Sequence, residues 1–109
     1  MQARERQLAE NEVRFRALNE RLRTRSATWG AADGEFELVC ECGDENCTDA
    51  IRLTPREYEA VRSSEAQFVI APGHERREVE DVVAEHDGWK VVRKRGEAAD
   101  LAAETDPRA

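Results

Sequence analysis

The sequence lacks most of the features that identify common functional classes. It contains no long hydrophobic run, so it shows neither a signal peptide nor a membrane-spanning helix. It also contains no Ser-His-Asp pattern and no glycine-rich phosphate loop, and it has only two histidines. From these absences we expect a cytoplasmic protein that does not act at a membrane and is not an enzyme.

Apolar and aromatic residues are also scarce. They make up 39% and 6% of the 109 residues, whereas 38% are charged. A chain of this length supports one domain with a small core, and such domains commonly depend on a disulfide, a metal or a partner. The three cysteines are an odd number, which leaves one thiol over in any disulfide scheme and fits a reducing compartment. The composition therefore favours a metal as the stabilising element.

The most informative feature present is a cluster of cysteines in the pattern Cys-x-Cys-x4-Cys. Cys40, Cys42 and Cys47 are the only cysteines, and His74 follows on a Pro-Gly corner. Alternate residues of a strand point the same way, so Cys40 and Cys42 present their sulfurs on one face. Three thiolates and one imidazole complete a tetrahedral shell for Zn²⁺. The sequence predicts a structural zinc site with these four ligands and no open position for a catalytic water.

Several alternatives to this interpretation remain open. The cysteines can also serve as small buried apolar residues, as a thiol-redox or zinc-release sensor, or as ligands of an iron–sulfur cluster. The other histidine, His86, is explained by packing on Trp89 beside a turn, so His74 is preferred as the fourth ligand. Glu75 is a candidate acceptor for the second imidazole nitrogen of His74.

Residues 1–26 are predicted to form a basic amphipathic helix. They carry seven arginines and four glutamates, whereas residues 27–109 carry a net charge of −10. We expect the narrow apolar stripe of this helix to contact a protein partner or a second copy of the chain, although docking on its own body is equally compatible with the pattern. The Arg-rich helix also allows a nucleic-acid-linked function, which the acidic body disfavours. The stripe consists of Leu8, Phe15, Leu18 and Leu22.

A linker at 27–34 is expected to precede a zinc-binding domain at 35–95. Residues 35–42 alternate in polarity and predict a strand, with two of its glutamates facing solvent and four apolar residues facing inward. A second short strand is expected at 50–53. The glutamates are Glu37 and Glu41, and the inward residues are Phe36, Leu38, Cys40 and Cys42.

The second half of the domain combines one short helix with further strands. Thr54 and Glu57 can form a capping box, with Pro55 at the first helical position, which predicts a helix ending near Ser63 with Tyr58 and Val61 facing the core. A third strand is expected at 67–71. Residues 79–94 are compatible with a helix, but a hairpin around Asp87-Gly88 explains the pairing better. The expected pairs are Glu85 with Lys90, Val83 with Val92, Ala84 with Val91 and His86 with Trp89.

Together these elements predict an α+β fold in which an N-terminal helix precedes a small, zinc-stapled antiparallel β-rich domain with one short helix. Residues 96–109 are expected to be a disordered polar tail. The chain resembles a group of small actinobacterial proteins to which no activity is assigned. The resemblance rests on the pattern Cys-x-Cys-Gly-Asp-x-x-Cys at Cys40–Cys47, on Pro72-Gly73-His74-Glu75 and on the closing Gly88-Trp89-Lys90-Val91-Val92. It covers most of residues 12–94 and implies the same architecture.

Overall fold

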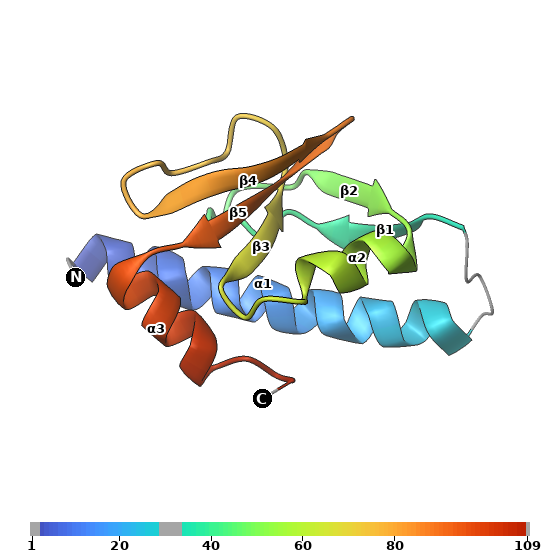
Figure 1. The fold of residues 1–109 in the computed structure, drawn as a ribbon, viewed down its shortest axis with the longest axis horizontal. Helices are drawn as coiled ribbons and strands as arrows, with labels where there is room; N and C mark the ends of the chain where they lie inside the picture. The colour runs from blue at the N-terminus through green and yellow to red at the C-terminus, as the bar shows by residue number, and fades with distance from the viewer. Residues whose placement is uncertain (1–2, 29–33, 109) are drawn as a thin grey trace.

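A computed structural model describes residues 3–28 and 34–108. Three helices pack around two small antiparallel sheets, which confirms the predicted α+β class (Figure 1). No helix in these two ranges is long and apolar enough to cross a membrane. In chain order the elements are α1 (Ala3–Thr28), β1 (Phe36–Val39), β2 (Ala50–Leu53), α2 (Pro55–Val61), β3 (Gln67–Ile70), β4 (Glu80–His86), β5 (Trp89–Lys94) and α3 (Gly96–Glu104).

The two sheets are joined by the segment that carries the first cysteines. β1 pairs with β2, and the other sheet has the order β3-β5-β4. Strand β1 is shorter than the predicted 35–42 because the chain changes partners after Val39. The amide of Cys40 still donates to the carbonyl of Asp49 at 3.2 Å, but the amide of Glu41 donates to the carbonyl of Val69 in β3 at 2.9 Å. The cysteine segment therefore lies between the two sheets.

The core extends across both sheets and includes two of the cysteines. The buried cluster also contains residues from α2 and α3, so it is a single core rather than two separate ones. Thr54 and Glu57 form the predicted capping box at the start of α2. The cluster consists of Leu38, Cys40, Cys42, Ile51, Leu53, Tyr58, Val61, Phe68, Val69, Ile70, Ala71, Trp89, Val91, Val92 and Ala102.

Helix α1 runs along one side of the molecule and docks on the chain's own body (Figure 1). The centre of its buried face is polar and consists of Asn11, Glu12, Arg16 and Asn19. The guanidinium of Arg16 is fully buried and donates to the carbonyls of Glu65 at 2.7 Å and Ala102 at 2.8 Å. The apolar stripe of Leu8, Phe15, Leu18 and Leu22 lies half-buried at the margin, with Leu22 packed against the core.

The hairpin at β4 and β5 confirms the preferred interpretation of residues 79–94. Three of the four expected pairs are present, and the rings of His86 and Trp89 stack with centroids 3.8 Å apart. The pairing of Val83 with Val92 is wrong. Val82 lies opposite Val92 instead, because an irregularity between Val82 and Ala84 leaves Val83 exposed.

The C-terminal segment differs from the expected disordered tail. Residues 96–104 form α3, which buries Ala98 and Ala102 and packs against α1. Beyond it, Asp106 forms an ion pair with the buried guanidinium of Arg62, and Arg108 bridges the carboxylates of α1 and α2. The predicted linker at 27–34 begins inside α1, and its residues 29–33 lie outside the described ranges.

Candidate metal centre

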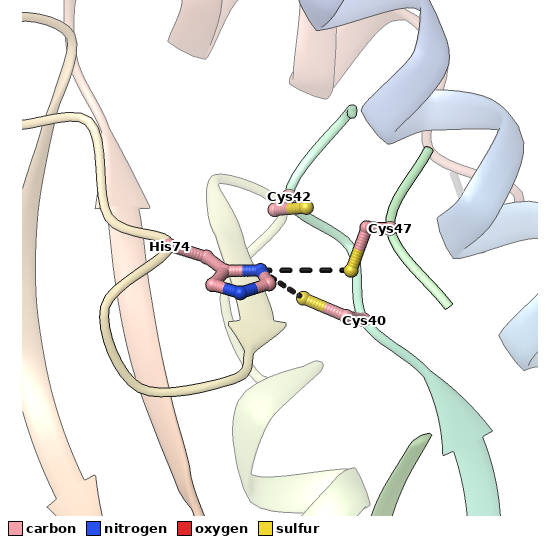
Figure 2. Close-up of side chains that lie close together, drawn as sticks. All are labelled: Cys40, Cys42, Cys47 and His74. Atoms are coloured by element: carbon pink, nitrogen blue, oxygen red, sulfur yellow. Dashed lines mark hydrogen bonds between the residues drawn. The ribbon is translucent and has the colours of Figure 1, made fainter. Parts of the chain in front are cut away.

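The structure brings the four predicted ligands together. Cys40 and Cys42 follow strand β1, Cys47 lies on the loop before β2, and His74 lies on the loop after β3. One ligand atom from each of the four lies within 4.8 Å of the other three. Figure 2 shows the three sulfurs and the imidazole ring facing a common point. The cluster therefore has the composition and proximity needed to hold one metal ion.

The ligand separations are close to those of a tetrahedral shell. A zinc ion with bonds of about 2.3 Å to sulfur and about 2.0–2.1 Å to nitrogen has sulfur–nitrogen separations of about 3.6 Å. The Nδ1 atom of His74 lies 3.4 Å from the Sγ of Cys40 and 3.6 Å from the Sγ of Cys47. The other ligand atoms lie no more than 4.8 Å apart.

The turn that carries Cys42 depends on the glycine that follows it. Gly43 has φ +83°, a left-handed conformation that favours glycine. It is also buried directly under α1, where an added Cβ would lie 2.6 Å from the carbonyl oxygen of Leu8 and 2.8 Å from the Cγ of Glu12. Both the backbone conformation and the lack of space therefore require glycine at this position.

Each sulfur accepts a hydrogen bond from a backbone amide. The amide of Ala71 donates to the Sγ of Cys40 at 3.2 Å. The amides of Asp44 and Asp49 donate to Cys42 and Cys47, in each case from two residues further along the chain. Because hydrogen bonds to a charged sulfur favour the thiolate, these amides offset part of the negative charge that three thiolates bring to the site.

The imidazole of His74 is held on its far side by a carboxylate. Its Nε2 lies 3.2 Å from the Oδ2 of Asp49, which leaves Nδ1 to face the sulfurs. Metal-bound histidines usually donate their second ring nitrogen in this way. Glu75, the residue expected in this role, instead accepts from Lys90 at 2.9 Å and from the amide of Gly73. Asp49 carries no recognisable sequence signal in so acidic a chain.

The three thiols also interact with one another. A hydrogen bond with Cys40 is the main reason that the pKa of Cys42 is lowered to about 5. The same hydrogen bond, together with burial, raises the pKa of Cys40, and burial raises the pKa of Cys47. One thiolate is therefore stabilised within the cluster. A metal cation that replaces the remaining thiol protons would bind more tightly as pH rises.

Glu41, between the first two ligands, points away from the sulfurs and into the protein. It was expected to face solvent, and this expectation is wrong, because its carboxylate is almost completely buried. One oxygen accepts the amide of Val69 at 2.9 Å and the other accepts the side-chain amide of Asn19 at 2.7 Å. Burial nevertheless raises the pKa of Glu41 to about 7. Its hydrogen bonds fix the segment that carries Cys40 and Cys42.

A buried ionic cluster lies next to the turn that carries Cys42. The ammonium of Lys94 forms ion pairs with the carboxylates of Glu12 in α1 and Glu80 in β4, and all three side chains are buried. The backbone amide of Arg76 donates a hydrogen bond to the carboxylate of Glu80, and its guanidinium donates to the carbonyl of Cys42 at 3.1 Å. Burial raises the pKa of Glu12 to about 7 despite the adjacent ammonium. The cluster connects α1, the hairpin and the cysteine turn.

Comparison with protein-family models, curated proteins and solved structures finds no match for this chain.

Proposed function

We propose that this protein is a non-enzymatic zinc-binding module in which a structural Zn²⁺ is held by Cys40, Cys42, Cys47 and His74. The convergence of these four ligand atoms within 4.8 Å is the observation that carries the proposal. The backbone amides at the sulfurs and the carboxylate at the imidazole support it, since such contacts orient ligands and stabilise their charge. A reducing compartment such as the cytoplasm keeps the three thiols available.

Zinc is favoured over an iron–sulfur cluster by the compactness of the site. An iron–sulfur cluster binds its protein ligands through two or more iron atoms, whereas a single metal ion binds all four ligands at one centre. Separations of 3.4 and 3.6 Å between Nδ1 and two sulfurs fit one ion. Four protein ligands complete the tetrahedral shell that structural zinc sites use, so the bound metal has no open position for substrate or water. This closed shell supports a structural rather than catalytic role.

We propose that the metal-stabilised body acts through contacts with a protein partner on the outer face of α1. That face carries exposed arginines, although the whole chain has a net charge of −7. Such a surface favours an acidic partner. The apolar stripe that was expected to contact a partner or a second copy is half-buried on the body of the same chain. Only the exposed part of these side chains is left for contact with a partner. The exposed arginines are Arg4, Arg6, Arg14, Arg21 and Arg25.

The metal proposal is tested by metal analysis of the purified protein and its variants. We expect one zinc per chain in the wild type and a large loss of zinc in Cys42→Ser and in His74→Ala. His86→Ala is the matched control, because His86 stacks on Trp89 and is not one of the four clustered residues. Zinc content unchanged in His74→Ala, or lost equally in His86→Ala, would remove His74 from the ligand set.

Nucleic acid is the second candidate partner, and the same exposed arginines favour it. A phosphate backbone binds such a surface with an affinity that falls steeply as salt increases. The double variant Arg21→Glu/Arg25→Glu reverses two exposed charges, and Arg56→Glu on α2 is a control at another exposed position. Binding to DNA or RNA at low salt that only the double variant loses would support this function. Wild-type protein that binds neither at low salt would exclude it and leave the protein partner.

A further inference from the structure

We propose that Asn11 and Asn19 of α1 are positioning residues of the metal centre, so that docking of α1 and metal binding strengthen each other. This inference rests on the proposed metal site and extends it to a helix that supplies no ligand. It follows from the hydrogen bonds that α1 makes on either side of the two ligands that follow β1.

Asn19 holds the chain on both sides of Cys40. Its Oδ1 accepts the amide of Val39 at 2.9 Å, and its Nδ2 donates to the carbonyl of Val39 at 2.8 Å and to the carboxylate of Glu41 at 2.7 Å. The side chain is completely buried, so these bonds are shielded from water. The other oxygen of Glu41 is held by the amide of Val69. Residues 39–41 are therefore fixed between α1 and β3.

Asn11 holds the chain immediately after Cys42. Its buried Nδ2 donates to the carbonyl of Gly43 at 2.9 Å. The Cα of Gly43 lies so close to α1 that an added Cβ would meet the carbonyl of Leu8 at 2.6 Å. No side chain therefore separates the helix from the turn, and a shift of α1 moves the turn with it.

The two asparagines act on opposite ends of the Cys40–Cys42 pair. Metal affinity depends on how well the ligand atoms are held in place before the ion arrives, and residues that orient ligands commonly change affinity by about 10–100-fold. By thermodynamic linkage, if docked α1 increases metal affinity by some factor, bound metal favours docked α1 by the same factor. The helix and the metal thus form one coupled unit.

The coupling is tested by titrating the full-length protein with Co²⁺, whose absorption reports thiolate ligation, and then displacing it with Zn²⁺. We expect Asn11→Ala and Asn19→Ala each to weaken Co²⁺ affinity about tenfold while keeping the wild-type absorption spectrum at saturation. Val82→Ala is a control that weakens packing on the core from β4 and leaves α1 unchanged. Arg21→Ala is a control on the exposed face.

The outcomes separate positioning from general stability. Affinity loss in the asparagine variants, with wild-type affinity in Val82→Ala and Arg21→Ala, supports the proposal. Wild-type affinity in Asn11→Ala, or an equal loss in Val82→Ala, overturns it while leaving the metal site intact. Wild-type protein that binds no Co²⁺ at all refutes the proposed metal site and this inference together. In the turn, Asn11→Ala removes only the hydrogen bonds of Nδ2 to the carbonyl of Gly43 and, at 3.5 Å, to the carboxylate of Glu45, so it decides the matter if Asn19→Ala does not fold.

Hydrogen exchange provides the reciprocal measurement. Saturating metal should slow amide exchange in α1 between Asn11 and Asn19 by the same factor by which the helix strengthens metal binding. Amides of the β4–β5 pairing, where none of the four ligands lies, should change less. Equal exchange in α1 with and without metal would contradict the coupling.

Discussion

Replacing Gly43 by alanine tests the packing of α1 on the cysteine turn. The substitution places a Cβ 2.6 Å from the carbonyl oxygen of Leu8 and 2.8 Å from the Cγ of Glu12, at a residue with φ +83°. The left-handed conformation costs a residue with a side chain about 1–2 kcal/mol, and forcing an extra carbon into a filled space costs about 1–3 kcal/mol more. We therefore expect Gly43→Ala to lower the free energy of unfolding by about 2–5 kcal/mol.

Gly88→Ala is the matched control for this prediction. Gly88 has φ +88°, but nothing lies within 4 Å of an added Cβ, so it isolates the conformational cost at about 1–2 kcal/mol. Denaturant unfolding of both variants with metal bound gives the comparison. We also expect Gly43→Ala to bind metal more weakly than Gly88→Ala, because α1 must move away from the turn. Equal destabilisation by the two substitutions would refute the close packing of α1 on Gly43.

Three further predictions concern the charged groups. Lys94→Met leaves Glu12 and Glu80 buried without their cation and should cost about 3–5 kcal/mol in denaturant unfolding. Lys90→Met, at a more exposed pair, should cost much less, and equal costs would contradict the buried cluster. Because the pKa of Glu12 is raised from 4.5 to about 7, the folded state keeps a proton that the unfolded state loses from about pH 4.5. The free energy of unfolding, measured relative to Glu12→Gln, should therefore fall as pH rises from about 4.5 to about 7. A difference between the two proteins that does not change with pH would argue against the raised pKa. Asp49→Ala should weaken metal affinity about tenfold in a chelator competition without changing the number of metal ions bound, and unchanged affinity would show that this carboxylate does not orient the imidazole.

The grouping of Cys40, Cys42, Cys47 and His74 was predictable because their residue types are rare in this chain. Three cysteines and two histidines leave few possible sets of four ligands. The stacking of His86 on Trp89 accounts for the second histidine. The hairpin and the start of α2 were predictable for a related reason. The Asp87-Gly88 turn and the capping box at Thr54 are local signals that act over a few residues.

The features that the sequence did not reveal depend on contacts between distant segments. The alternation of 35–42 placed Glu41 on the solvent side, but Asn19 and Val69 cover that side and provide donors for its carboxylate. Likewise, the apolar stripe suggested which face of α1 is buried. The central contacts are instead polar, because Arg16 finds two backbone carbonyls as acceptors, one of them at Ala102 in α3.

Helix α3 was missed because its local signals are weak. Arg95 at its N-cap makes no side-chain capping bond, and the segment begins with Gly96. Its stability comes from packing on α1, which buries Ala98 and Ala102, and such support is invisible to local patterns. The carboxylate behind the imidazole was missed for a comparable reason, since Asp49 is one acidic residue among twenty-four.

X-ray absorption at the bound metal tests the central claim most directly. If Cys40, Cys42, Cys47 and His74 close the shell, the zinc edge should fit three sulfurs at about 2.3 Å and one nitrogen at about 2.0–2.1 Å, with no further ligand. The imidazole should disappear from the fit in His74→Ala and persist in His86→Ala. A shell that contains an oxygen from water, or fewer than three sulfurs, would contradict the closed structural site.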